Sequence, residues 1–251
     1  MFIDTHCHLS LEDYSDIDQV LKDNREKGVM SIIISGCSRD DILEALDYSK
    51  RYDDVYATIG YHPSEALTTT DYDLELLEDQ LQSSNKVVGL GEIGLDYYYG
   101  KESKEEQLRL FDKQLEIAER LQIPVVIHSR SATEDTIKTL KKYKVSGVIH
   151  CFSGSLETAQ EYIRMGYSLG IGGVVTFKNS NLKEVVKKLP LESIVLETDS
   201  PYLTPEPFRG QKNSSKYIPI IASFIASIYG VSVDEVSRVT TSNAKKIFSL
   251  D

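Results

Sequence analysis

The chain has 251 residues, which suits a single (β/α)8 barrel of about 250 residues and is enough to bury a sizeable core. Hydrophobic residues make up 41% and charged residues 27%, which is typical of an ordinary soluble globular protein. The formal net charge of −11 argues against a protein that coats nucleic acid non-specifically, but not against an enzyme that grips one strand end locally.

The N-terminal segment and the cysteines indicate a cytoplasmic protein. The chain starts with Met1-Phe2-Ile3-Asp4, which has no basic region and opens no long apolar run, so we expect neither a cleaved signal peptide nor a membrane span. Its three cysteines, at positions 7, 37 and 151, are odd in number and far apart, so we expect buried thiols rather than disulfides.

Short apolar runs rich in Val and Ile alternate with amphipathic segments along the whole chain. Such runs are typical of parallel strands that are buried on both faces. Strands are predicted at 1–5, 29–35, 55–61, 87–90, 124–127, 147–149, 167–171 and 194–196. Helices are predicted near 17–27, 41–51, 74–81, 108–121, 132–143, 155–165, 182–189, 215–229 and 233–248.

This alternation predicts one domain over residues 1–251, a (β/α)8 TIM barrel with parallel strands and an extra C-terminal helix. A doubly wound open sheet is the alternative fold. Gly230 is expected to end the first of the two tail helices. The proline-rich segment 200–215 is expected to be a structured functional loop rather than a domain boundary.

All the histidines fall at the ends of predicted strands, at positions 6, 8, 62, 128 and 150. Glu92 and Asp199 follow two further strands in the same way. Barrels of this type keep their chemistry at the carboxyl ends of the strands. One strand-end histidine alone is more often a structural residue, but seven metal-competent side chains at one rim favour a metal site.

His6 and His8 give the sharpest local signal, because residues i and i+2 of a strand point to the same face. Neutral imidazole is a good ligand for Zn, Mn, Ni or Fe. A carboxylate such as Glu92 or Asp199 can bridge two cations, and two hard cations suit in-line displacement at phosphorus.

Six blocks contain these candidates: Phe2-Ile3-Asp4-Thr5-His6-Cys7-His8, Gly60-Tyr61-His62-Pro63, Gly91-Glu92-Ile93-Gly94-Leu95-Asp96, Ile127-His128-Ser129-Arg130, His150-Cys151-Phe152-Ser153-Gly154 and Glu197-Thr198-Asp199-Ser200-Pro201. Together they resemble the signature blocks of the TatD family, metal-dependent hydrolases related to the amidohydrolases. Many members are described as deoxyribonucleases. The resemblance runs from Phe2 to Asn243-Ala244 and departs from the family pattern at Ser214-Ser215.

The resemblance implies two divalent metal ions per chain, which the ligand types allow to be Mg, Mn, Zn, Ni or Fe. It implies that Glu92 bridges the two ions. One ion would be held by His6, His8, Glu92 and Asp199, and the other by Glu92, His128 and His150. The resemblance also places His62 beside the substrate phosphate, and it implies 3′-to-5′ exonuclease activity in some members.

These residues suggest a mechanism in which Asp199 accepts the proton of a metal-activated water. His62 and Arg130 or Arg209 would stabilise the phosphoryl oxygens, although either arginine can instead be a structural ion-pair partner. Glu197 has the strand parity of Asp199, so we expect it to accept a proton from a ligand imidazole; the alternative is a buried acid paired with a lysine.

We therefore expect a divalent-metal-dependent 3′-5′ exodeoxyribonuclease that acts as a monomer on the 3′ end of single-stranded DNA, with no membrane partner. Tyrosines 97–99 can stack on its bases or merely close the barrel rim. The alternative function is a metal-dependent esterase acting on aminoacyl-tRNA or a small phosphoester. A metal-stabilised scaffold would not need both His62 and Asp199, and a two-carboxylate glycosidase would leave the histidines idle.

Overall fold

The computed structural model describes residues 1–250. It contains eight strands: β1 Phe2–Cys7, β2 Val29–Gly36, β3 Val55–Ile59, β4 Val87–Asp96, β5 Val125–Arg130, β6 Gly147–Ile149, β7 Tyr167–Ile171 and β8 Ile194–Leu196. The helices between and after them are α1 Ile17–Glu26, α2 Arg39–Arg51, α3 Asp71–Leu81, α4 Lys104–Leu121, α5 Thr133–Leu140, α6 Leu156–Arg164, α7 Leu182–Val186, α8 Ile218–Tyr229 and α9 Val233–Phe248.

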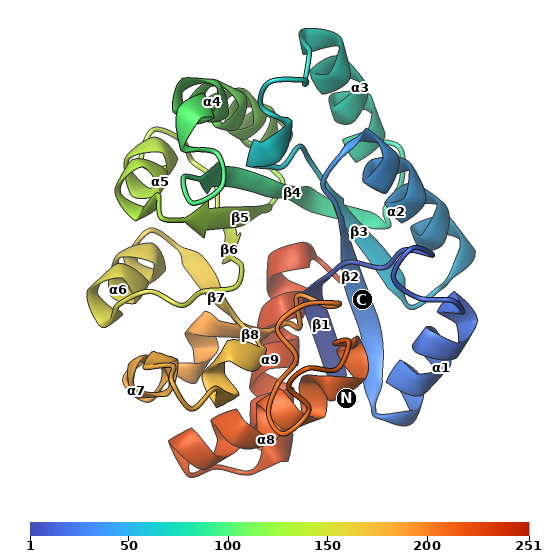
Figure 1. The fold of residues 1–251 in the computed structure, drawn as a ribbon, viewed down its shortest axis with the longest axis vertical. Helices are drawn as coiled ribbons and strands as arrows, with labels where there is room; N and C mark the ends of the chain where they lie inside the picture. Colours follow the sequence, from blue (N-terminus) through green and yellow to red (C-terminus); the bar gives the residue numbers. More distant parts are fainter. Residues whose placement is uncertain (251) are drawn as a thin grey trace. The chain divides into compact units, whose positions relative to one another are not determined.

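The chain divides into two compact units. The terminal unit comprises residues 1–34 and the chain from His150 onward, and the middle unit comprises residues 35–149. Figure 1 shows them by colour: the terminal unit carries the blue start and the yellow-to-red end of the chain, and the middle unit the colours between.

In the terminal unit, β1 lies between β2 and the last strand, β8. It pairs in parallel with β2. On its other side, the amide of Asp199 donates to the carbonyl of His6 (3.0 Å) and the amide of His8 donates to the carbonyl of Ser200 (2.7 Å). β8 pairs in parallel with β7. Helices α8 and α9 pack on β1 and β8.

The middle unit holds four consecutive strands, in which β4 pairs in parallel with β3 and β5, and β5 with β6. Eight consecutive β/α repeats whose last strand lies beside the first have the connectivity of a (β/α)8 barrel. The predicted fold class, including the additional C-terminal helix, is therefore confirmed. An open doubly wound sheet does not place its first strand beside its last, so that alternative is wrong.

Local sequence explains where several helices begin and end. Side-chain oxygens of Asp16, Ser38, Thr70, Ser155 and Ser232 accept hydrogen bonds from amides in the first turns of α1, α2, α3, α6 and α9. Such caps satisfy amides that a helix start leaves without partners. Gly230 ends α8 at φ 69, as predicted, because glycine adopts this left-handed conformation without steric cost.

Three strands extend two or more residues further than the sequence predicts, and one of them is β1, which runs to Cys7 and so includes His6. β4 runs to Asp96 and β5 to Arg130, since their pairing continues to the Asp96–Arg130 pair. Glu92 and His128 therefore lie inside strands rather than after them. Polar residues of the candidate site interrupt the apolar sequence pattern, so the predicted strands end early. The hydrogen bonds between the strands continue past that point.

The strand interiors form the core of each unit. In the terminal unit Ile32, Ile33 and Ile34 are at most 2% exposed, and in the middle unit Ile93 and Leu95 are fully buried. Over residues 1–250, no single helix has the length and hydrophobicity needed to cross a bilayer. The segments Ser215–Tyr229 and Val233–Phe248 meet the criterion only as a pair, bent by 109°.

Candidate functional site

The predicted site residues lie at the carboxyl ends of the strands or in the segments that follow them. The terminal unit contains His6 in β1, His8 and His150 immediately after strands, and Asp199 and Arg209 beyond β8. The middle unit contains Glu92 in β4, His128 and Arg130 in β5, and His62 shortly after β3.

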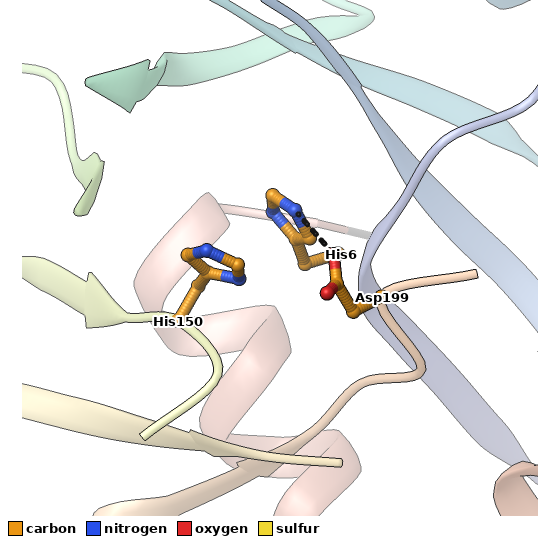
Figure 2. Close-up of side chains that lie close together, drawn as sticks. All are labelled: His6, His150 and Asp199. Carbon is orange, nitrogen blue, oxygen red and sulfur yellow. Dashed lines mark ion pairs between the residues drawn. The ribbon is translucent and has the colours of Figure 1, made fainter. Parts of the chain in front are cut away.

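In the terminal unit, three histidines gather around one carboxylate. Oδ1 of Asp199 lies 3.5 Å from Nε2 of His6 and 3.6 Å from Nε2 of His8. The rings of His6 and His150 are stacked, with centroids 4.0 Å apart. Figure 2 shows His6, His150 and Asp199 arriving from separate segments and turning toward one another. His6, His150 and Asp199 each offer a ligand atom within 4.8 Å of the others.

The imidazoles around Asp199 favour its ionised form. Burial opposes its ionisation, but hydrogen bonds and charge interactions with the surrounding imidazoles outweigh burial and hold its pKa far below the usual value. Its backbone has φ 55, a conformation uncommon for a residue with a side chain and found repeatedly at functional sites.

Two buried acids, Asp4 and Glu197, contact the segments that carry the histidines and Asp199. Asp4 accepts hydrogen bonds from the amide of Thr198 (3.0 Å) and its hydroxyl (2.6 Å), which joins β1 to the segment carrying Asp199. Burial raises the pKa of Asp4 to about 6, although hydrogen bonds from Thr198 and Ser215 lower it. Ser215, where the sequence departs from the family pattern, thus supports a buried acid.

Glu197 is fully buried, and burial raises its pKa to about 8. Its Oε1 accepts the amide hydrogen of Cys151. The same oxygen lies 3.8 Å from Nδ1 of His150, which is too far for the expected hydrogen bond. No lysine pairs with Glu197 among residues 1–250, so the alternative of a buried acid–lysine pair is wrong.

In the middle unit, His128 lies between two carboxylates. Its Nδ1 is 2.6 Å from Oε1 of Glu92, and its Nε2 is 3.2 Å from Oδ2 of Asp96. His62 lies at the edge of this cluster, with Nε2 4.0 Å from Oε1 of Glu92. His62, Asp96 and His128 also form a group able to hold a metal ion.

The two carboxylates favour a positive charge at His128. Burial alone would lower the pKa of His128, but hydrogen bonds to Asp96 and Glu92 outweigh it and raise the pKa to about 9. Burial opposes ionisation of Asp96 as well. Hydrogen bonds from His128 and from the amides of Tyr99 and Tyr98 nevertheless lower its pKa to about 2. A side-chain cluster with this electrostatic preference suits a bound cation.

Sequence reasoning missed two residues of the middle cluster. The strand predicted at 87–90 ends before Asp96, but Asp96 is the buried last residue of β4 and contacts His128. Its spacing of four from Glu92 was the available signal, because strand residues i and i+4 share a face. The thiol of Cys37 lies 3.6 Å from Oε2 of Glu92, and no pattern in the sequence indicated this contact.

The two candidate substrate arginines stack on aromatic rings. Arg130 lies over Tyr98 and Tyr99. Arg209 lies over Phe177, with 3.9 Å from Cζ to the ring centroid, and donates a long hydrogen bond to the carbonyl of Thr204 (3.4 Å). Neither arginine forms an ion pair within residues 1–250, so the alternative of a structural ion-pair partner is wrong for both.

The loop between β8 and α8 is structured, as expected. The buried Asn213 donates from Nδ2 to the carbonyls of Thr198 (2.9 Å) and Tyr202 (2.5 Å). Asn213 thereby holds the loop against the segment that carries Asp199. The ring of Tyr202 lies 6.3 Å from that of His8, and Tyr202 is exposed.

The donor atoms of each unit fit a divalent metal ion. Each cluster combines imidazole nitrogens with carboxylate oxygens, the mixture that Zn, Mn, Ni and Fe accept. In each cluster a histidine and a carboxylate offer ligand atoms within 4.8 Å of one another. Such close imidazoles and carboxylates at strand ends are typical of a site that binds cations.

Comparison with known proteins gives a consistent result. A family model described as "TatD related DNase" matches residues 3–249. The Bacillus subtilis "Uncharacterized metal-dependent hydrolase YabD" is 40% identical, over 100% of both chains. The solved structure of the TatD homologue YjjV from Escherichia coli K12 has a TM-score of 0.93 at 32% identity, covering 100% of this chain and 98% of that one. A TatD family hydrolase from Entamoeba histolytica has a TM-score of 0.89 at 26% identity, covering 98% and 97%.

Proposed function

The chain belongs to the TatD family and is a metal-dependent hydrolase, and from this premise we propose that it is a 3′-to-5′ exodeoxyribonuclease acting on single-stranded DNA. The observation that carries the proposal is the clustering of imidazoles and carboxylates at the strand ends of each unit, in a chain that matches the family model described as "TatD related DNase". This donor chemistry suits hydrolysis at phosphorus.

We propose two divalent ions per chain, as the family resemblance implies. His6, His8, Glu92 and Asp199 would hold one ion, and Glu92, His128 and His150 the other. When bound, the ions would lower the pKa of a water molecule and neutralise charge on the phosphoryl oxygens. The ligand contacts within each unit and the low pKa of Asp199 support this assignment.

Asp199 is the group we assign to accept the proton of the attacking water. Its carboxylate is ionised and close to two imidazoles, so it can take up a proton and share it with neighbouring nitrogens. Glu92 is the other catalytic carboxylate. Its side chain is 5% exposed and contacts His128, which fixes its orientation.

His62 is the group we assign to the substrate phosphate. Its Nδ1 accepts the amide hydrogen of Ser64 (3.1 Å), so the neutral ring carries its proton on Nε2. That proton can be donated to a phosphoryl oxygen as negative charge develops there. Arg130 and Arg209 would contact further phosphates, and both guanidinium groups are free of ion pairs among the described residues.

The test is an assay of the purified protein with manganese on single-stranded DNA labelled at either end. We expect stepwise release of mononucleotides from the 3′ end. An aminoacyl-tRNA substrate and a small phosphomonoester are assayed in parallel. Release of amino acid without nucleotide release from DNA would replace the nuclease with the esterase alternative.

The variant His62→Ala separates substrate binding from metal binding. We expect kcat/KM on DNA to fall by roughly 100- to 1,000-fold, as for loss of one donor to a developing anion, while the metal content measured by mass spectrometry stays the same. Ser64→Ala, which leaves the ring in place, should cause a smaller loss. A fall in metal content in His62→Ala would make His62 a ligand instead.

A further inference from the structure

Two exposed tyrosines and one arginine form a cluster beside the middle metal-ligand group. Tyr98 is 62% exposed and Tyr99 71% exposed. Their rings are perpendicular, with centroids 4.7 Å apart. The guanidinium of Arg130 lies over both rings, at 4.4 Å and 4.7 Å from their centroids. The loop after β4 thus presents aromatic surface and positive charge together.

The carboxylate of Asp96 contacts both the backbone of this cluster and the proposed metal ligand His128. Oδ1 of Asp96 accepts the amide hydrogens of Tyr98 and Tyr99, each at 2.9 Å. Its other oxygen, Oδ2, lies 3.2 Å from Nε2 of His128. The buried Gln107 secures the same loop through the carbonyls of Asp96 (3.0 Å) and Gly100 (2.7 Å). The backbone that carries the two rings is therefore fixed in position relative to His128.

The tyrosine hydroxyls and the guanidinium group of this cluster form no hydrogen bond or ion pair that stabilises the described part of the fold. The neighbouring Tyr97 is different, because its hydroxyl donates to Asp135 (3.0 Å) and its ring contacts Lys104. The hydroxyls of Tyr98 and Tyr99 have no hydrogen-bond partner in the described chain, and Arg130 has no ion pair there. Exposed aromatic rings on a fixed backbone, with hydroxyls that bond to no other described residue, indicate a binding surface.

We propose that Tyr98, Tyr99 and Arg130 form a subsite for single-stranded DNA, in which an unpaired base stacks on the tyrosines and Arg130 contacts the adjoining phosphate. The proposal rests on the proposed nuclease function and extends it to the recognition of the strand. Aromatic side chains bind unpaired bases of any sequence by stacking. In a protein with a net charge of −11, a local cation is needed to hold the phosphate backbone.

Binding of an eight-nucleotide, fluorescein-labelled oligothymidylate measures the subsite directly. Phosphorothioate linkages slow its cleavage, so anisotropy gives the Kd in the presence of manganese. The variant Tyr98→Ala/Tyr99→Ala should bind it roughly 5- to 150-fold more weakly. An oligonucleotide of the same length with abasic sugars should bind equally to the variant and to the wild type, because it has no base that can stack on the tyrosine rings.

Two further variants serve as controls, and a third tests the phosphate contact. Tyr98→Phe/Tyr99→Phe keeps both rings and should retain the wild-type Kd. Tyr72→Ala removes an equally exposed tyrosine (64%) from α3 and should change nothing. Arg130→Ala should reduce the slope of log Kd against log salt concentration by about 0.7, the value for one phosphate contact on a single strand.

Two results would overturn the subsite: an unchanged Kd in the double alanine variant, or an equal loss on the base-containing and abasic strands. Hydrolysis of methyl p-nitrophenyl phosphate, which carries no base, should persist in the variant and shows that the metal centre is intact. If the wild type hydrolyses no phosphodiester, the proposed function fails, while base-dependent binding still tests the subsite separately.

Discussion

Gly170 in β7 occupies a position where the terminal unit has no space for a side chain. A Cβ atom built there would overlap the carboxylate of Glu197. Glu197 in turn accepts the amide hydrogen of Cys151, the residue after the candidate ligand His150. The missing side chain at Gly170 therefore leaves room for a buried acid directly beneath the terminal cluster.

Gly170→Ala should lower the free energy of unfolding by about 1–3 kcal/mol, the usual cost of overpacking a filled interior. Gly172→Ala is the matched control, because a Cβ there meets the carbonyl oxygen of Glu197 at an ordinary 3.4 Å. Urea denaturation of both variants measures the difference. Equal stabilities would mean that the Glu197 carboxylate moves aside without cost.

At the scale of elements, the start of α3 is fixed by a reciprocal cap and one ion pair. Oδ2 of Asp73 accepts hydrogen bonds from the amide (2.8 Å) and the hydroxyl (2.6 Å) of Thr70. The guanidinium of Arg39, from the start of α2, donates to Oδ1 of the same carboxylate. The hydrogen bonds from Thr70 and Arg39 lower the pKa of Asp73 to about 2.

A lowered pKa in the folded state makes the Asp73 contribution depend on pH in a definite direction. The stabilisation is complete above the unfolded value of 3.8 and is lost as the pH falls through about 2. Between pH 5 and pH 2, we expect the free energy of unfolding of the wild type to fall by about 1–2 kcal/mol more than that of Asp73→Asn. Urea unfolding across this range measures it.

Asp79→Asn is the control for this pH effect. It removes an exposed carboxylate from the same helix, and the Asp79 side chain makes no hydrogen bond within residues 1–250. Its stability should follow the wild type at every pH. Parallel curves for the wild type and Asp73→Asn would show that the cap is not sensitive to protonation.

At the scale of the whole molecule, metal binding should stabilise the folded chain, because the clustered ligand atoms exist only after folding. Manganese at about 100 times its Kd should raise the free energy of unfolding by about 2.7 kcal/mol. For a chain of this size that corresponds to a Tm roughly 5–10 °C higher than in a chelator. Differential scanning calorimetry measures the shift.

The variant His6→Ala/His8→Ala tests whether the stabilisation arises at the proposed ligands. Removing two imidazoles from the terminal cluster should reduce the metal-dependent part of Tm, while the Tm in chelator changes much less. A wild-type Tm that stays constant from chelator to millimolar manganese would contradict metal binding at these ligands.

The sequence by itself determined the order of strands and helices, the family, and the residues with metal-binding chemistry. Hydrophobic periodicity is a local property, so β6, β7 and β8 fall where the apolar runs predict them. The helix stop at Gly230 was equally predictable, because it depends only on the conformational freedom of one residue.

Only the tertiary structure decided which side chains touch. Asp96 contacts His128, Cys37 contacts Glu92, and Arg130 stacks on two tyrosines instead of pairing with an acid. Strand parity gives the face of a residue but not its partner on a neighbouring element. That partner depends on register and on how far a strand extends, and both are set by hydrogen bonding and packing between segments distant in sequence.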